Sequence, residues 1–184
     1  ERTEQVAACV IALPAPQMLR IYETLDPVRR KIAEGIEYAT AVGVHVGLAK
    51  KPADEPAILL QVPRTEHPDL SAIIIDHNKA PGRAPQGKGL YATYWQHEWG
   101  IRQWDRDDTA IVADAIFGIG KILPAFVRDI EFTHVQRWRY GPGLPRVGSY
   151  RALAGFQSAA NPNSRVRLAG DYFYFAVDKD GAYD

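Results

Sequence analysis

An alternation of residue types between positions 38 and 48 constrains the fold of this chain more than any other feature of its sequence. In an extended strand, successive side chains point to opposite faces, so residues two apart share a face. One face would carry Val42, Val44, Val46 and Leu48, and the other Ala41, Gly43, His45 and Gly47. This repeat of two residues predicts a β-strand, the clearest one in the chain.

Other stretches also predict strands. Five of them lie at residues 57–62, 72–76, 90–95, 130–139 and 166–169. A continuous apolar run at residues 6–13 ends at Pro14 and Pro16, which is typical of a strand buried on both faces. Cys9 lies in that run, so we expect it to be buried and unreactive.

Helical signals lie between the strand signals, at residues 16–22, 27–35, 105–123 and 147–160. Asp26 and Pro27 are typical of the start of a helix. In the last helix, Tyr150, Leu153 and Ala154 would share one side. Together the signals predict an α+β fold with a mixed, largely antiparallel sheet and flanking helices.

Composition excludes some classes of function. The 184 residues carry 22 Lys and Arg against 22 Asp and Glu, so no basic field attracts nucleic acid or an anionic membrane. No apolar stretch approaches the roughly 18 residues of a membrane span, and no signal peptide is visible. The single cysteine excludes an intramolecular disulfide and fits a reducing compartment. We therefore expect a cytoplasmic protein without a transmembrane segment.

No complete catalytic motif is present in the sequence. Residues 82–89 copy most of a P-loop spacing, but Gly89 stands where a hydroxyl should hold magnesium, and Pro85 removes a donor. The five histidines show no metal-ligand spacing, so no metal site is predicted. His45 and His134 are interpreted as satisfied or exposed sheet residues. No serine lies in a nucleophile elbow, so the catalytic residues stay unknown.

Aromatic residues form two clusters. One contains Tyr91, Tyr94, Trp95, Trp99 and Trp104, and the other contains Trp138 and Tyr140. Large aromatic side chains usually belong to a core, but rigid rings also line ligand cavities. If the strand at residues 130–139 continued to Tyr140, the rings of Trp138 and Tyr140 would share a face.

Three segments, in their order and spacing, resemble the C-terminal half of flavin-containing amine oxidases, protoporphyrinogen oxidases and phytoene-desaturase-like proteins. They are residues 9–16, residues 135–138 with the following prolines, and residues 165–171, which end in Gly-Asp. In that family the first is a strand and turn returning from the FAD domain. The second is a Trp-bearing strand leading to a loop near the flavin, and the third ends at an acid beside the cofactor.

This resemblance implies an FAD-dependent oxidoreductase that oxidises an amine or other small organic substrate by hydride transfer to flavin. It implies cofactor-binding residues Ala12, Pro14, Gly170 and Asp171, and substrate-pocket residues Trp138 and Tyr140. No GxGxxG dinucleotide fingerprint occurs, so this chain would be the substrate-binding part of a larger polypeptide and inactive alone. The implied partners are a small-molecule substrate and a missing N-terminal FAD-binding region, and a homodimer stays open.

The resemblance also implies a division of the chain. Residues 1–16 would return from the FAD-binding domain, residues 17–160 would form the substrate-binding domain, and residues 161–184 would return to the FAD-binding domain and add a tail. Two other classes of function stay open. One is a non-catalytic domain whose aromatic cavity binds a small molecule, and the other is an interaction module that uses an exposed sheet edge.

Overall fold

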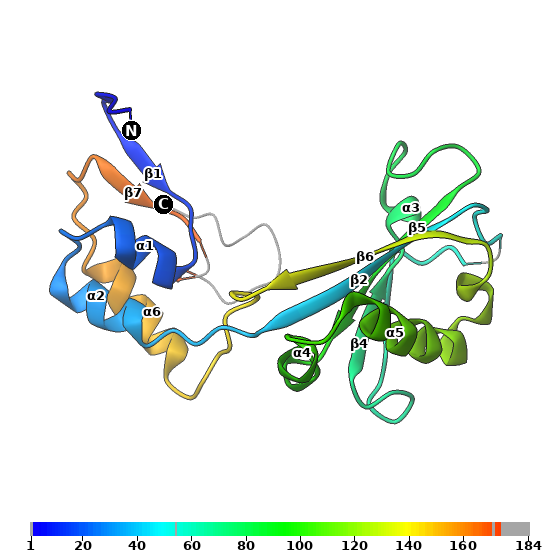
Figure 1. The fold of residues 1–184 in the computed structure, drawn as a ribbon. Helices are drawn as coiled ribbons and strands as arrows, with labels where there is room; N and C mark the ends of the chain where they lie inside the picture. Colours follow the sequence, from blue (N-terminus) through cyan, green and yellow to red (C-terminus); the bar gives the residue numbers. More distant parts are fainter. Residues whose placement is uncertain (1, 54, 171, 174–184) are drawn as a thin grey trace. The chain divides into compact units, whose positions relative to one another are not determined.

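The computed structural model describes residues 2–53, 55–170 and 172–173, and the chain divides into two compact units (Figure 1). Thr40–Arg139 forms the central unit, and the described residues of Glu1–Ala39 and Tyr140–Asp184 form the terminal unit. Residues 17–39 and 140–160 pack with the end segments. The expected division after residues 16 and 160, with the functional roles of its three segments, stays a prediction.

A five-stranded sheet is the main feature of the central unit. Its strands are β2 (Ala41–Leu48), β3 (Leu59–Gln61), β4 (Leu70–Ile74), β5 (Gly89–Trp95) and β6 (Ile130–Trp138). They lie in the order β3-β4-β5-β2-β6, and every neighbouring pair is antiparallel. The strands predicted at residues 42–48, 57–62, 72–76, 90–95 and 130–139 therefore all belong to it, and the predicted fold class is confirmed.

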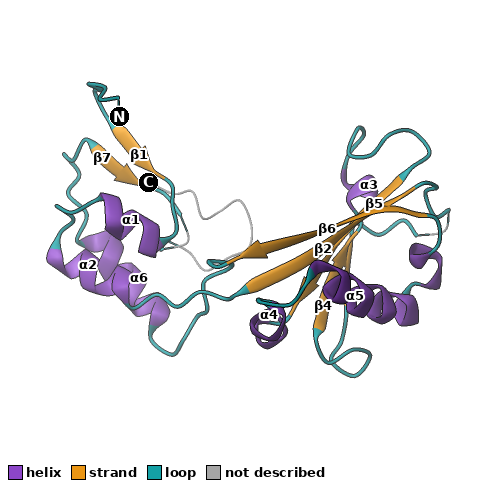
Figure 2. Cartoon of the chain, viewed as in Figure 1, coloured by secondary structure: helices purple, strands orange, loops and turns teal. Residues whose placement is uncertain are grey.

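α4 (His97–Gln103) and α5 (Asp108–Ile122) pack against one face of this sheet (Figure 2). The other helical segments are α3 (Asp76–Lys79), which contacts β5, and a 3₁₀ turn at Pro124–Val127. The carboxylate of Asp107 begins α5 by accepting from the backbone N–H of Ala110 at 2.9 Å. The apolar side of β2 meets the apolar stripe of α5 in one buried cluster that includes Val42, Val44, Val46, Leu48, Ile111, Ala115 and Ile119. Strand and helix periodicity thus define the same core from its two sides.

The terminal unit combines two parallel strands with three helices. The strands β1 (Cys9–Ile11) and β7 (Val166–Leu168) pair with each other, and the helices are α1 (Ala15–Ile21), α2 (Pro27–Glu34) and α6 (Ser149–Ser158). Asp26 begins α2 as predicted, accepting from the N–H groups of Val28 and Arg29 at 2.9 and 3.1 Å. The core of this unit contains Ile11, Met18, Leu153, Phe156, Leu168 and Tyr172.

Two expectations for the terminal unit were wrong. The strand expected at residues 6–13 is only three residues long, and its Val10 is 63% exposed instead of buried on both faces. Cys9 is also exposed. The reason is that β1 pairs only with β7 within the described part of the chain, so only Ile11 reaches the core. In α6, Leu153 and Phe156 form the buried side, while Tyr150 is exposed.

Among the described residues, no helix is both long enough and apolar enough to cross a membrane.

Candidate functional site

Three of the four residues expected to bind a cofactor lie at one edge of the β1–β7 pair. Ile11 is paired with Leu168, and the N–H of Ala169 donates to the carbonyl of Ile11 at 3.0 Å. Ala12 and Pro14 therefore follow one parallel strand where Gly170 follows the other. Asp171, the fourth residue, lies outside the described residues. The carboxyl ends of parallel strands are where open α/β sheets bind ligands.

Tyr172 fixes the backbone at this edge. Its hydroxyl lies 3.0 Å from the carbonyl oxygens of both Ile11 and Ala169, and its ring is fully buried. Gly170 has a φ of +149°, a backbone conformation that residues with a side chain rarely adopt. A Cβ at this position would stand 3.3 Å from the Tyr172 ring. Tyr172 was missed from the sequence, because only the fold brings it to the ends of both strands.

A second candidate site is the face of the central sheet opposite the core. Paired residues of neighbouring strands share a face, so the β6 residues paired with His45 and Gly47 of β2 lie on this face with them. We call this surface the aromatic face and define it as His45, Tyr94, Phe132, His134 and Trp138. Three of its members are large exposed rings, with Phe132 52%, Tyr94 46% and Trp138 42% exposed.

Glycines in β2 make room for the rings of β6. A Cβ built on Gly43 would stand 3.3 Å from the Trp138 ring, and one on Gly47 would overlap the Phe132 ring. Glycine in a strand interior is typical of places where another group approaches closely. The sequence pattern had predicted that Gly43, His45 and Gly47 share one face of a strand. On that face, the Trp138 ring packs against Gly43 and the Phe132 ring packs against Gly47.

His45 lies between these rings as a half-buried imidazole. It faces His134 across the strand pair, with ring centroids 6.2 Å apart, and its centroid is 6.3 Å from that of Trp138. Burial lowers the pKa of His45 below its ordinary value, and His134 lowers it further, while Asp76 opposes the shift. His45 is therefore neutral near pH 7. The sequence had suggested only a satisfied or exposed sheet residue at this position.

The strand β6 does not continue to Tyr140. β6 ends at Trp138, so the strand alternation that would align the two rings stops before Tyr140. Tyr140 belongs to the terminal unit, where its ring contacts Tyr38 edge-on at 5.6 Å. A substrate role for Tyr140 stays a prediction.

Within the described part of the chain, no group of three or more His, Cys, Asp or Glu could hold a metal ion.

No protein-family model matches the chain, and no curated protein matches it at a significant level. Solved structures share its fold instead. A protein described as a protoporphyrinogen oxidase from Exiguobacterium sp. is 13% identical, with a TM-score of 0.64 over 89% of this chain and 36% of that one. Reduced UDP-galactopyranose mutase is 17% identical, with a TM-score of 0.63 over 92% of this chain and 36% of that one.

Cyclohexylamine oxidase from Brevibacterium oxydans is 13% identical, with a TM-score of 0.62 over 96% of this chain and 39% of that one. At these identities the likeness is one of fold. The chain spans between 36% and 39% of the length of these three proteins. Parts of the protein described as a protoporphyrinogen oxidase and of cyclohexylamine oxidase therefore have the fold of this chain.

Proposed function

We propose that this chain is the substrate-binding part of an FAD-dependent oxidoreductase, and that the aromatic face forms a wall of its substrate cavity. The reaction would be the oxidation of an amine or other small organic substrate, with hydride transfer to the flavin. The fold shared with part of a protoporphyrinogen oxidase and of a cyclohexylamine oxidase supports this proposal.

One observation carries the proposal, namely the contrast between the two faces of the same sheet. The core face buries Val42, Val44 and Val46 almost completely, whereas the aromatic face exposes three large rings. Apolar side chains exposed together on one face are typical of binding surfaces, and this contrast supports the proposal. Rings mounted on paired strands form a rigid wall, and such a wall orients a substrate and excludes water from it.

His45 supplies a polar group at the centre of this wall. As a neutral imidazole it donates from one nitrogen and accepts at the other, so it can hold a polar group of the substrate. Positive charge develops on a substrate carbon as hydride leaves it. A neutral His45 does not repel that charge, whereas an imidazolium would. The lowered pKa of His45 therefore suits the proposed reaction.

The residues at the β1–β7 edge fit a cofactor in their chemistry. Ala12 is small and exposed, so a ligand can approach the backbone closely at this position. Bound FAD would supply the hydride acceptor. Its pyrophosphate requires a dinucleotide fingerprint, which this sequence does not contain, so the proposal places that contact in a region outside this chain.

Anaerobic mixing of the full-length protein with a panel of primary amines tests the proposal, with bleaching of the flavin absorbance as the signal. Trp138→Leu should slow flavin reduction at least about tenfold, the effect of a misplaced substrate, without changing the flavin content. Phe117→Leu is the matched control, because Phe117 is an exposed ring on α5, away from the aromatic face.

Two results would contradict the proposal. A full-length protein without flavin would remove the cofactor from it. Equal reduction rates in the wild type and in Trp138→Leu would remove the aromatic face from the substrate cavity.

A further inference from the structure

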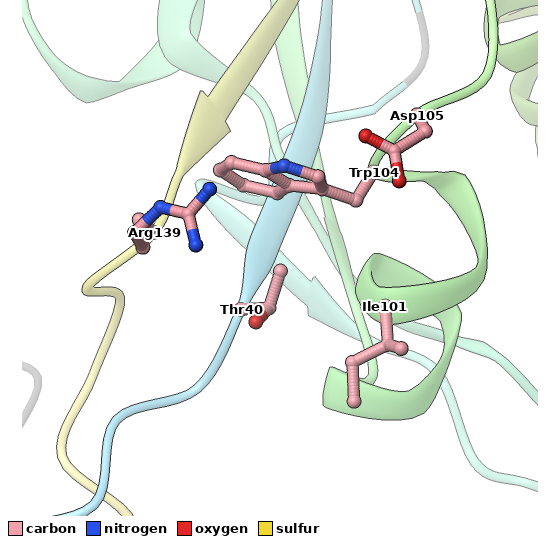
Figure 3. Close-up of a pocket in the computed structure, with 5 residues that line it drawn as sticks. All are labelled: Thr40, Ile101, Trp104, Asp105 and Arg139. Atoms are coloured by element: carbon pink, nitrogen blue, oxygen red, sulfur yellow. The ribbon is translucent and has the colours of Figure 1, made fainter.

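A pocket of about 400 Å³ opens beside α4, where β2 begins and β6 ends. This volume lies within the range of small-molecule sites. The pocket is lined by Thr40, Ile101, Trp104, Asp105 and Arg139 (Figure 3). All five belong to the central unit, and none belongs to the aromatic face.

Arg137 holds the wall of this pocket in place. Its Nε donates to the carbonyl of Trp104 at 3.0 Å, and its guanidinium donates to the carbonyl of Arg106 at 2.7 Å. The same guanidinium pairs with Asp108 at 2.7 Å. These three contacts fasten the connection between α4 and α5 to β6. A site on such a supported wall keeps its geometry without a ligand.

Arg139 and Asp105 are the two charged groups of the lining. The neighbouring arginines Arg102, Arg106 and Arg137 pair with Asp69, Asp114 and Asp108, respectively. Neither Arg139 nor Asp105 makes an ion pair within the described part of the chain. In Figure 3 their charged groups lie on opposite sides of the Trp104 ring. The pocket therefore presents one cation and one carboxylate to a ligand.

Toward the described residues, the guanidinium of Arg139 makes a ring contact and no hydrogen bond. Its carbon atom lies 4.9 Å from the centre of the Trp104 ring, a cation–π contact. Such a contact leaves the in-plane N–H groups of the guanidinium free, and these match the two oxygens of a carboxylate.

We propose that this pocket binds a small α-amino acid as its zwitterion. The carboxylate accepts from Arg139, the ammonium group donates to Asp105, and the side chain lies on Ile101 and Trp104. A simple carboxylate would be attracted to Arg139 but repelled by Asp105, and a simple amine would meet the reverse. A ligand with both charges satisfies both groups. This proposal does not depend on the proposed function.

Three ligands of similar shape test the proposal by isothermal titration calorimetry on the full-length protein. L-leucine carries both charges, 4-methylpentanoate only the carboxylate, and 3-methylbutylamine only the ammonium group. Leucine should bind about two- to fivefold more tightly than either analogue, as expected for loss of one solvent-exposed ion pair. The fluorine NMR line of 5-fluorotryptophan at Trp104 should shift on leucine addition, and a Trp104→Phe variant assigns that line.

Variants separate the two charges. Arg139→Met should weaken leucine binding about two- to fivefold, whereas Arg83→Met, which removes an exposed arginine from a loop distant in sequence, should not. Asp105→Asn should reduce the preference for leucine over 4-methylpentanoate, because the repulsion of the carboxylate is removed. The proposal is overturned if 4-methylpentanoate binds as tightly as leucine, if no ligand binds, or if Arg139→Met leaves leucine affinity unchanged.

Discussion

The ring of Trp138 lies against Gly43 across the β2–β6 pair, so closely that a Cβ at Gly43 would stand 3.3 Å from the ring. The same Cβ would stand 3.2 Å from the carbonyl oxygen of Thr93. Both neighbours must therefore move in Gly43→Ala, and the more exposed Trp138 should move further. We expect a loss of about 1 kcal/mol of stability. We also expect a changed Trp138 emission, measured as the difference from Trp138→Phe, and an unchanged emission would contradict this packing.

Two helical glycines should respond to alanine in opposite ways. A Cβ at Gly100 of α4 would collide with the backbone carbonyl of Thr40, which cannot rotate away as a side chain can. Gly100→Ala should lower the free energy of unfolding by about 2 kcal/mol.

Gly120 of α5 is the matched position, because its added Cβ would meet only Val127 at an ordinary 3.5 Å. Gly120→Ala should raise the free energy of unfolding by about 0.5–1 kcal/mol, as expected for alanine in a helix interior. Urea denaturation of both variants measures the difference, and a change of the same sign in both would contradict it.

The central sheet was predictable because its signals are local. The alternation from Val42 to Leu48 selects the buried face of β2 within a few residues, and Asp107 marks the start of α5 beside it. The terminal unit depends on contacts between distant segments. Ile11 and Tyr172 are 161 positions apart, and nothing near either residue indicates that a tyrosine hydroxyl would meet the end of β1.

The candidate site was only partly predictable for the same reason. The family resemblance predicted a pocket role for Trp138, which stays a prediction, and the structure places its ring on an exposed face. The sequence did not show that the strand ends before Tyr140, because the end of β6 depends on where the chain leaves the sheet. The sequence did not single out Arg139. That it has no ion pair among the described residues emerges only once the fold pairs Arg106 with Asp114 and Arg137 with Asp108.

The 184-residue chain, expressed alone, should purify without colour. The sequence lacks a dinucleotide fingerprint, so most of a bound flavin nucleotide would lie in water. An absorbance spectrum of the purified chain checks this expectation. A yellow preparation with about one flavin per chain would show that the chain holds the cofactor unaided.

Two tryptophans should differ in their contribution to stability. Trp99 is 4% exposed and stacks on Trp95 at 4.1 Å, so Trp99→Leu leaves a void in the core. It should cost about 3 kcal/mol. Trp138 is 42% exposed, so Trp138→Leu should cost less than about 1 kcal/mol. Equal losses in thermal unfolding would show that Trp138 is a core residue rather than part of a binding surface.

His67 should make the stability of the central unit depend on pH. Its Nδ1 accepts from the N–H groups of Asp69 and Leu70 at 3.2 and 3.0 Å, and both bonds require that nitrogen to be unprotonated. Burial lowers the pKa of His67 below its ordinary value of 6.5, and Lys121 adds to the shift while Asp69 opposes it. The unfolded chain therefore binds the proton first as the pH falls. This stabilisation is complete above about pH 6.5 and is lost as the pH drops through the folded-state pKa.

His67→Asn separates this effect from the other histidines. The asparagine oxygen can accept from the amides two and three positions ahead, as His67 does, but it does not titrate in this range. We expect the free energy of unfolding of the wild type to fall more steeply than that of His67→Asn between about pH 7 and pH 5. Urea denaturation across this range measures both slopes. Parallel curves would show that protonation of His67 is not what weakens the fold, and that its two backbone bonds survive at acid pH.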